Sequence, residues 1–591
     1  MVRGAATPVM FGPSERALFG FYHAPHGPVV HATGVVLCNP LGYEMMCAHR
    51  AYRHFAERLA ASGFHALRFD YQGTGDSSGY PDEPHRVRAW LDSIGLAIGE
   101  LRDRAGIAKI ALFGVRFGAT LAAVAAAQRG DVDELVLWAP SPSGRVYVRE
   151  LRAFRLIKEQ EAPKPRRDGD EEVAGYLFDR EAVADISALD LSTLKGHTAS
   201  RILVVPRDDL PGGEARLVKH FEATGASAKL ATEPGYAKMM RDPQDTVVPH
   251  ATLDAMIAWL AEAPEPPPPA HAPREEHATV MTATTPSGRR VREEALQFGD
   301  GERLFGILTE PTDRAPRSDL PTLLFLNVGA NHRVGPNRMY VSLARDLATR
   351  GYLGFRFDVA GLGDSRIAPG ARENRLYSKD SVVDVKAAMD FLERTRDRRR
   401  FVLLGLCSGA YLAFHTAVED PRVVGQVLLN PQTFEWKEGD SLELSMRKSF
   451  MSTRFYARAA FDPTVWGRVL RGRVNVRGIA GVLRERLLTQ ARSSAETWTA
   501  RLRGRTGPST EIERAFVAMS DRGVESLLVF SFNDGGLDMI EKHLGPNVRK
   551  VRHRKNVYFE IVDGADHTFT PIGSQHTLHD IVTRYVTGAF R

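Results

Sequence analysis

The feature that most constrains this chain is an internal repeat. The segment RAYRHFAERLAASGFHALRFDYQGTGDS, from Arg50, aligns without a gap with RMYVSLARDLATRGYLGFRFDVAGLGDS, from Arg338. Shorter matches pair 11–20 with 298–306 and 111–122 with 403–413. Matches in the same order along two stretches of the chain predict two copies of one folding unit.

A proline-rich segment separates the two copies. The stretch AEAPEPPPPAHAPREEH, from Ala261 to His277, favours an extended backbone and has little apolar surface to bury. We therefore predict a first domain at 1–262, a linker at 263–280 and a second domain at 281–591.

Each half alternates short apolar runs with longer amphipathic ones. In the second half, helical periodicity appears at 337–349 and 379–395, between apolar runs that predict buried strands. Those runs are 323–327, 353–357, 401–405, 423–430, 526–532 and 557–562. The alternation predicts an α/β fold, with a mostly parallel sheet covered by helices on both faces. In such folds ligands bind beyond the carboxyl ends of the strands.

Composition excludes several classes of protein. With 43% hydrophobic and 25% charged residues, the chain is neither disordered nor fibrous. Three cysteines in 591 residues exclude a disulfide framework and favour a reducing compartment. The first residues lack the layout of a secretory signal, and no apolar run reaches about 18 residues, so we expect a cytoplasmic protein. Metal-ligand spacings and phosphate loops are also missing from the sequence, so we predict no metal and no cofactor.

The pentapeptide Gly405-Leu406-Cys407-Ser408-Gly409 follows an apolar strand and precedes a helical pattern. A nucleophile on a sharp strand-to-helix turn needs small neighbours, and the glycines supply them. Cys407 is the candidate nucleophile. Ser408 is the alternative, although it lies one position past the centre of the frame. A third interpretation is that Cys407 is a small buried apolar residue.

The partners of such a nucleophile follow in the expected order. Asp534 comes directly after one apolar strand, and His567 lies in a loop after the next. Nucleophile, acid, histidine is the chain order of an α/β-hydrolase triad. His567 would accept the thiol proton and Asp534 would orient its imidazole. Asp538 and Asp566 are the competing candidates for the acid.

An oxyanion hole needs two backbone N–H groups. We predict that Ser408 supplies one, and that Ala330, in the loop after an early strand, supplies the other. His332 and Arg333 in the same loop either contact an anionic part of the substrate or are solvated.

Together these elements resemble α/β-hydrolases over nearly the whole chain outside the linker. The tandem arrangement is similar to bacterial serine aminopeptidase-like hydrolases, and the first half resembles the hydrolases that accompany exosortase systems. With a cysteine at the nucleophile position, the second half resembles dienelactone hydrolases and polyhydroxyalkanoate synthases rather than ordinary esterases. Simple ester or peptide hydrolysis therefore does not follow from the resemblance.

The first copy lacks two of the three residues of the candidate triad. At the aligned positions Arg116 replaces the nucleophile and Lys238 replaces the histidine, whereas Asp209 keeps the acid. Arginine is neither a base nor a nucleophile near neutral pH. We therefore predict a catalytically silent domain. Either Arg116 and Asp209 form a buried ion pair, or Arg116 and Lys238 bind a carboxylate or phosphate.

An insertion at about 432–525 lies where such folds carry a lid. Between 441 and 520 it holds fifteen basic and six acidic residues, a net charge of +9 against +6 for the whole chain. The interleaved apolar residues suggest helices with one buried and one basic face. That face is either merely solvated or attracts an anionic acyl substrate or its carrier. No nucleic-acid motif accompanies the arginines.

Three functions remain open. The first is a cysteine-dependent acyl hydrolase that cleaves an ester or thioester through an acyl-enzyme. The second is an acyltransferase with the same Cys-His-Asp triad, and the third is a non-catalytic binding or scaffold protein. The sequence leaves the acyl group, acceptor, pathway and oligomeric state open.

Overall fold

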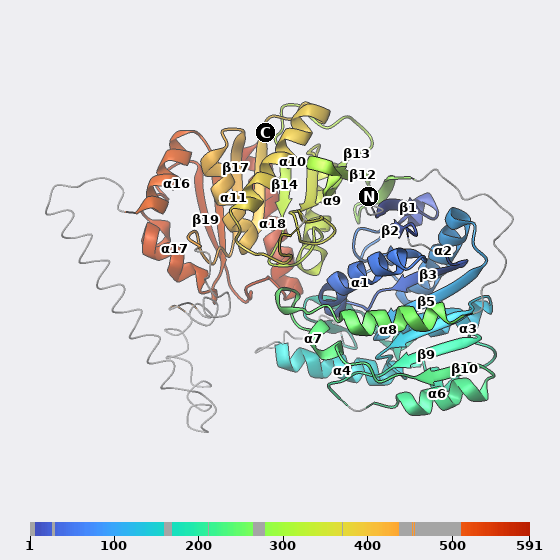
Figure 1. Cartoon of the computed structure of the whole chain (residues 1–591). Coiled ribbons are helices and arrows are strands. Elements are labelled where there is room, and N and C mark those ends of the chain that lie inside the picture. Colours follow the sequence, from blue (N-terminus) through green and yellow to red (C-terminus); the bar gives the residue numbers. More distant parts are fainter. Residues whose placement is uncertain are drawn as a thin grey trace, which may run out of the picture. The chain divides into compact units, whose positions relative to one another are not determined.

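A computed structural model shows two mostly parallel β-sheets, each flanked by helices (Figure 1). It describes residues 6–26, 30–158, 168–210, 212–263, 278–368, 370–436, 452, 454 and 510–591. The predicted fold class, two tandem α/β domains, is therefore confirmed. Most of the predicted lid, and 264–277 of the linker, lie outside the described residues.

The first sheet has eight strands in the order β1-β2-β4-β3-β5-β6-β9-β10. Only the β1–β2 and β2–β4 pairings of this sheet are antiparallel. The strands are β1 (Thr7–Phe11), β2 (Leu18–His23), β3 (Thr33–Cys38), β4 (His65–Phe69), β5 (Lys109–Val115), β6 (Glu134–Trp138), β9 (Arg201–Val205) and β10 (Ser227–Leu230). A small hairpin, β7 (Glu171–Val173) and β8 (Tyr176–Phe178), stands apart from this sheet.

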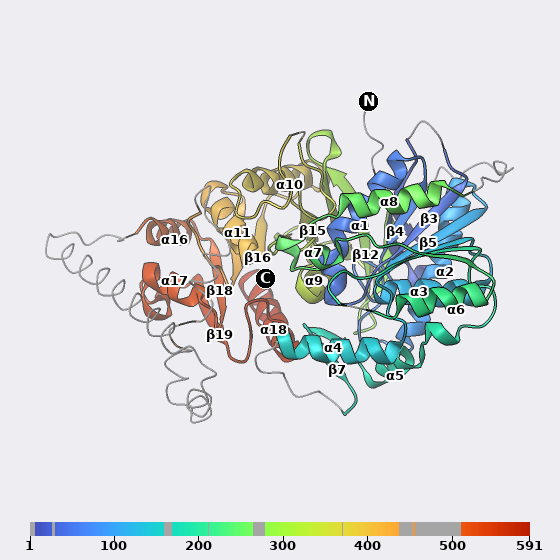
Figure 2. The ribbon, with the colours of Figure 1, turned by 60° about the horizontal axis from the view of Figure 1, so that its bottom comes forward.

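Helices pack on both faces of the first sheet, and its central strands are therefore buried on both sides. One apolar layer joins the sheet to α2 (Arg86–Ala105), α3 (Phe117–Arg129), α5 (Arg180–Ala188) and α6 (Glu214–Ala223). The opposite layer joins it to α1 (Tyr43–Ala61), α7 (Tyr236–Met239) and α8 (His250–Ala261). Figure 2 shows these helices from a second direction, together with α4 (Gly144–Lys158).

The second sheet has nine strands in the order β11-β12-β13-β15-β14-β16-β17-β18-β19. From β14 onward all neighbouring strands are parallel. The strands are β11 (Val280–Thr284), β12 (Arg290–Phe298), β13 (Leu304–Pro311), β14 (Thr322–Leu326), β15 (Gly354–Asp358), β16 (Phe401–Leu406), β17 (Val423–Leu429), β18 (Glu525–Ser531) and β19 (Val557–Val562).

The helices of the second half follow the same alternation. They are α9 (Met339–Thr349), α10 (Asp380–Arg396), α11 (Ser408–Glu419), α16 (Glu511–Asp521), α17 (Gly536–Leu544) and α18 (Ile572–Ala589). Helix α11 packs on β16 and β17, and α10 packs on α11. The strands and helices predicted for this half from periodicity are confirmed to within about two residues.

The strand order fixes where a site can form. After β14 the chain crosses to β15 on one side, and from there it returns to β16 on the other side of β14. Such a reversal opens a crevice at the carboxyl ends of the strands. In the second half the loops after β14 and β16 flank that crevice, and in the first half the loops after β3 and β5 do so.

The described residues form two compact units whose borders differ from those of the sheets. The first comprises Met1–Gln297, Phe305–Pro316 and Ala330–Gly351, and the second comprises Phe298–Leu304, Arg317–Gly329 and Tyr352–Arg591. Helix α9 therefore packs with the first copy of the repeat, although it belongs to the second copy in sequence.

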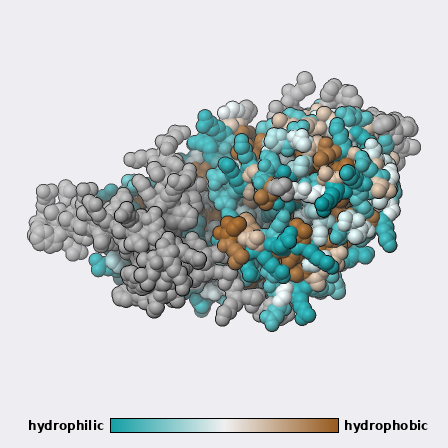
Figure 3. Space-filling model, turned by 90° about the horizontal axis from the view of Figure 1, so that it is seen from below, coloured by the Kyte–Doolittle hydropathy of each residue, from teal (hydrophilic) through white to brown (hydrophobic). Residues whose placement is uncertain are grey.

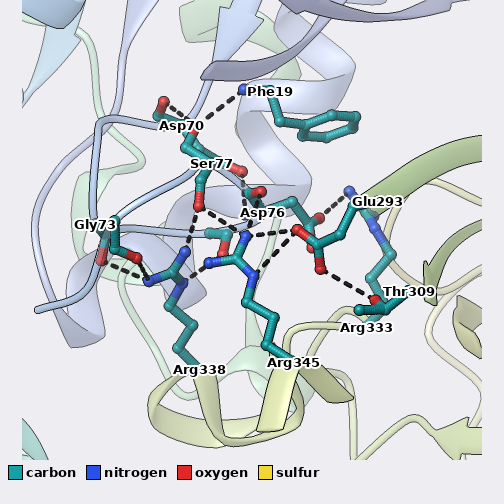
Figure 4. A network of polar contacts seen from close by, with 12 residues as sticks. Phe19, Asp70, Gly73, Asp76, Ser77, Glu293, Thr309, Arg333, Arg338 and Arg345 are labelled. Carbon is teal, nitrogen blue, oxygen red and sulfur yellow. Dashed lines mark hydrogen bonds and ion pairs between the residues drawn. The ribbon is translucent and has the colours of Figure 1, made fainter. Parts of the chain in front are cut away.

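A buried network of arginines holds the α9 segment within the first unit (Figure 4). The side chains of Arg345 and Glu293 are both 0% exposed and form an ion pair at 2.6 Å. Arg333 pairs with Asp76 at 2.7 Å. Arg338 instead donates to carbonyl oxygens of the GTGDSSG loop, including those of Gly75 and Gly79 at 2.7 Å. Burial and the nearby charge of Arg345 lower the pKa of Arg338 to about 9.

On the face shown in Figure 3, the coloured surface is mainly hydrophilic and its apolar residues form small groups. Leu156 and Ile157, at the end of α4, are among the exposed apolar side chains. Within the described part of the chain, no helix combines the length and apolar character needed to span a membrane.

Candidate active site

Cys407 occupies a strained turn between β16 and α11. Its backbone has φ 57° and ψ −113°, a region that costs a non-glycine residue about 1–3 kcal/mol. Both glycines of the frame are required by close backbone contacts. A Cβ on Gly405 would lie 2.1 Å from the carbonyl carbon of Gly409, and one on Gly409 would lie 2.7 Å from the oxygen of Asn327. Strain at a tip that remains partly exposed is typical of a functional residue.

The predicted acid and histidine meet after β18 and β19. Nδ1 of His567 lies 2.6 Å from Oδ2 of Asp534. The other carboxylate oxygen of Asp534 accepts hydrogen bonds from the side chain of Gln432 at 2.7 Å and from the N–H of Gly536 at 2.8 Å. Asp534 is thus a buried carboxylate with both oxygens occupied, aimed at the imidazole.

The competing carboxylates are placed differently. Asp566 accepts from the N–H of Thr570, and Asp538 lies in the first turn of α17. Of the three predicted candidates, Asp534 contacts the imidazole of His567 directly. The geometry therefore favours the acid that the sequence analysis preferred.

Electrostatics favour a charged pair between Cys407 and His567. Burial by itself raises the pKa of the Cys407 thiol, but the charge of His567 and the hydrogen bond with Tyr377 outweigh burial and lower it. Burial by itself lowers the pKa of His567, but the charges of Asp534 and Cys407 outweigh burial and raise it well above its usual value. The opposite shifts favour thiolate and imidazolium over the neutral pair.

The hydroxyl of Ser408 points elsewhere. Its oxygen accepts a hydrogen bond from the N–H of Gly329 at 2.9 Å, in the loop after β14. Ser408 begins α11, so its N–H belongs to the first helical turn, as the oxyanion prediction requires. Ala330 comes directly after Gly329 but belongs to the first compact unit, and its role remains a prediction.

His332 and Arg333 are buried within the first unit. The ring of His332 stacks on His49 at 4.1 Å, and the side chain of Arg333 is 1% exposed and paired with Asp76. These contacts do not favour the predicted binding of substrate. They also show that the alternative, solvated side chains, is wrong, because both residues are buried and their contacts anchor the segment after Gly329.

In the first half, Arg116 keeps the strained conformation of the turn, with φ 55° and ψ −127°. Its guanidinium pairs with Glu44 of α1 at 2.9 Å and with Glu150 of α4. The predicted ion pair between Arg116 and Asp209 is therefore wrong, because the guanidinium of Arg116 is paired with these two other carboxylates instead. Asp209 pairs with Arg207 at 2.6 Å.

The position aligned with His567 is also changed. Lys238 lies in α7 and is exposed. Because Arg116 already has two carboxylate partners, binding of an anion by Arg116 and Lys238 gains no support from the contacts and remains only a prediction.

Two residues of the candidate site were not predicted from the sequence: Gln432, which contacts Asp534 and His567, and Tyr377, which contacts Cys407. Gln432 follows β17 closely, so its position at the carboxyl end of a central strand was a usable signal. The hydroxyl of Tyr377 lies 3.1 Å from Sγ of Cys407. Tyr377 comes from the loop before α10, and no motif marks it.

The three cysteines should react very differently. Cys38 and Cys47 are buried, and burial raises their pKa far above the usual value, whereas the pKa of Cys407 is lowered. We expect iodoacetamide near neutral pH to label Cys407 alone in the folded protein, because the thiolate is the reactive form. Peptide mass spectrometry before and after unfolding measures this. Equal labelling of Cys38 and Cys407 in the folded state would contradict the expected ionisation.

Comparison with known proteins locates a similarity in each half. The family described as serine aminopeptidase, S33, matches residues 42–188 and 328–461, together a little less than half of the chain. No curated protein matches the sequence.

Solved structures also match. Est1E from Butyrivibrio proteoclasticus is 16% identical, with 44% of this chain and 98% of Est1E covered and a TM-score of 0.33. An α-β serine hydrolase homologue from Coxiella burnetii is 14% identical, with 53% of this chain and 99% of the homologue covered and a TM-score of 0.28. In one segment of each half the chain is thus similar to the serine aminopeptidase family, and both halves have the α/β-hydrolase fold.

Proposed function

We propose that the second half is a cysteine-dependent acyl hydrolase acting on an ester or thioester. The observation that supports the proposal is a site in which Cys407 is strained and partly exposed and His567 is hydrogen-bonded to Asp534. The family similarity supports hydrolysis in general, and the thiol chemistry is our inference from these contacts.

In the proposed reaction Sγ of Cys407 attacks the acyl carbonyl carbon, and the C–O or C–S bond to the leaving group breaks. The imidazolium of His567 gives its proton to the leaving group. Neutral His567 then takes a proton from water, whose oxygen attacks the thioester of the acyl-enzyme. The C–S bond of the acyl-enzyme breaks, the acid is released and the thiolate leaves, and the imidazolium keeps the proton taken from water, so that the resting pair of thiolate and imidazolium re-forms. Asp534 holds the imidazole in one orientation throughout.

Backbone N–H groups would stabilise the negative oxygen formed in each attack. The N–H of Ser408 at the start of α11 is one proposed donor, and that of Ala330 is the other. The hydrogen bond from Gly329 to the Ser408 hydroxyl supports this arrangement, because it ties the loop after β14 to the nucleophile turn.

We also propose that the two halves arose by tandem duplication and that the first is catalytically silent. The two sheets share the inner order of strands, and Arg116 and Cys407 share a rare backbone conformation. An arginine neutralised by Glu44 and Glu150 supplies no nucleophile, so retention of the strained turn is best explained by ancestry.

The substrate we propose is a small or carrier-bound acyl compound of anionic character, met in the cytoplasm. The segment between 441 and 520 carries a net charge of +9 in the sequence, and a concentration of positive charge raises the local concentration of anions.

Trapping the acyl-enzyme tests the function. The protein is mixed with a panel of nitrophenyl esters and acyl-CoAs and quenched in acid, and intact mass is measured. We expect an added acyl mass that maps to the peptide holding Cys407. Product analysis with added alcohols and amines separates hydrolysis from transfer. If the panel yields turnover without any adduct on Cys407, the cysteine mechanism is refuted.

A further inference from the structure

Tyr377 lies against the proposed nucleophile, and nothing in the triad accounts for it. It comes from the loop between β15 and α10, and its hydroxyl oxygen is 3.1 Å from Sγ of Cys407. The residue is 3% exposed, so its hydroxyl is removed from bulk water. A buried phenol normally keeps a hydrogen-bond partner, and the sulfur is the one that the structure gives it.

The ring of Tyr377 is held on two sides. It stacks on Trp436, with centroids 4.7 Å apart and planes at 18°, and it meets the edge of Tyr411 at 5.4 Å. Its backbone has φ 55°, an unusual value for an aromatic residue. A strained backbone and a clamped ring fix the direction of the hydroxyl, as expected of a group placed for one contact.

The chemistry of the pair determines which atom donates. A thiolate has no proton, so it can only accept, and the phenol must donate. Burial and then the charge of Cys407 raise the pKa of Tyr377 well above its usual value, so the phenol keeps its proton. Tyr377 therefore donates a hydrogen bond to the sulfur, and it does not act as a general base near neutral pH.

We propose that Tyr377 is a catalytic hydrogen-bond donor to Cys407 that sets the pH range in which the nucleophile is ionised. The proposal rests on the function proposed above. The hydrogen bond stabilises the thiolate but not the thiol, so it keeps the nucleophile charged at lower pH. It also makes each thiolate somewhat less nucleophilic, because reactivity falls as the thiol pKa falls.

Among the residues that the structure describes, the titratable groups that act on the sulfur come from three loops. His567, after β19, carries the opposite charge, and Asp534, after β18, carries a like charge that raises the pKa of the thiol. Tyr377, before α10, is neutral. The histidine and the phenol both stabilise the thiolate, and loss of the phenol alone leaves the ion pair with His567 in place.

The test is the pH dependence of alkylation of Cys407 by iodoacetamide in the full-length chain. For Tyr377→Phe we expect the rate near pH 6 to fall about tenfold to a hundredfold, the range for one hydrogen bond to a charged group. At about pH 9 or above we expect a rate equal to or higher than that of the wild type, because the freed thiolate is more nucleophilic. The plot of kcat/KM against pH should shift in the same direction.

Tyr411→Phe is the matched control. The hydroxyl of Tyr411 is buried and has no hydrogen-bond partner among the described residues, and its ring touches Tyr377. Its removal changes the same aromatic cluster without touching the sulfur, so the alkylation profile should stay that of the wild type.

Three outcomes distinguish the proposed role of Tyr377 from the proposed function of the protein. A profile shifted to higher pH in Tyr377→Phe and unshifted in Tyr411→Phe supports the proposal. An unshifted profile, or an equal loss of rate at every pH, overturns it, because a merely structural tyrosine would slow the reaction uniformly. If Cys407→Ala retains hydrolysis, the proposed function is refuted, and the catalytic role of Tyr377 falls with it even where the profile shifts.

Discussion

Cys407→Ala is expected to lower kcat/KM for any ester or thioester that the protein hydrolyses by about 10⁴-fold to 10⁶-fold. The reason is that the variant retains binding and the oxyanion donors but cannot form the acyl-enzyme. Steady-state rates on the best substrate of the panel, together with loss of the acyl adduct in intact-mass spectra, measure the effect.

Ser408→Ala is the matched control, because it alters the neighbouring residue of the same turn. It keeps the backbone N–H and removes only the hydroxyl that accepts from Gly329. We expect a loss of less than about tenfold, the cost of one ordinary hydrogen bond. The reverse pattern, with activity lost in Ser408→Ala and kept in Cys407→Ala, would identify a serine enzyme.

Glu293→Gln is expected to lower the free energy of unfolding of the first compact unit by about 3–5 kcal/mol. The variant leaves the guanidinium of Arg345 buried without its opposite charge. The carbonyl oxygens of Asp76 and Ser77 that Arg345 also contacts carry no full charge to replace it. Denaturant unfolding followed by circular dichroism measures the shift.

Two further variants serve as controls for the stability measurement. Replacing both partners, Glu293→Met with Arg345→Met, should recover much of the loss, because no buried charge is then left alone. Asp92→Asn breaks an exposed pair with Arg88 in the same unit and should leave its unfolding unchanged, since exposed pairs contribute little. Equal effects of Glu293→Gln and Asp92→Asn would show that the buried network does not stabilise the unit.

The fold was predictable because its signals are local. Apolar runs of strand length alternate with helical periodicity, so β14 to β19 and helices α9 to α11 lie where the sequence indicates. The turn at Cys407 was equally local, because two glycines at fixed offsets are the condition for backbone to pass that closely. Chain order then led to Asp534 and His567, which the structure brings within 2.6 Å.

The neighbours of the two turns were not predictable, because they depend on side chains from distant segments. Glu44 and Glu150 neutralise Arg116 from α1 and α4, which excluded the expected pairing with Asp209. Tyr377 reaches Cys407 from a loop whose length and path carry no sequence pattern.

The sequence alone therefore determined the two tandem α/β domains, the strained turn and the order of the candidate triad, since period and spacing act over a few residues. Only the tertiary structure decided which charges meet. It packed α9 with the first copy through Arg333, Arg338 and Arg345, and it set a phenol beside the thiol. Burial of a charge depends on every segment that folds around it, and no local pattern encodes that.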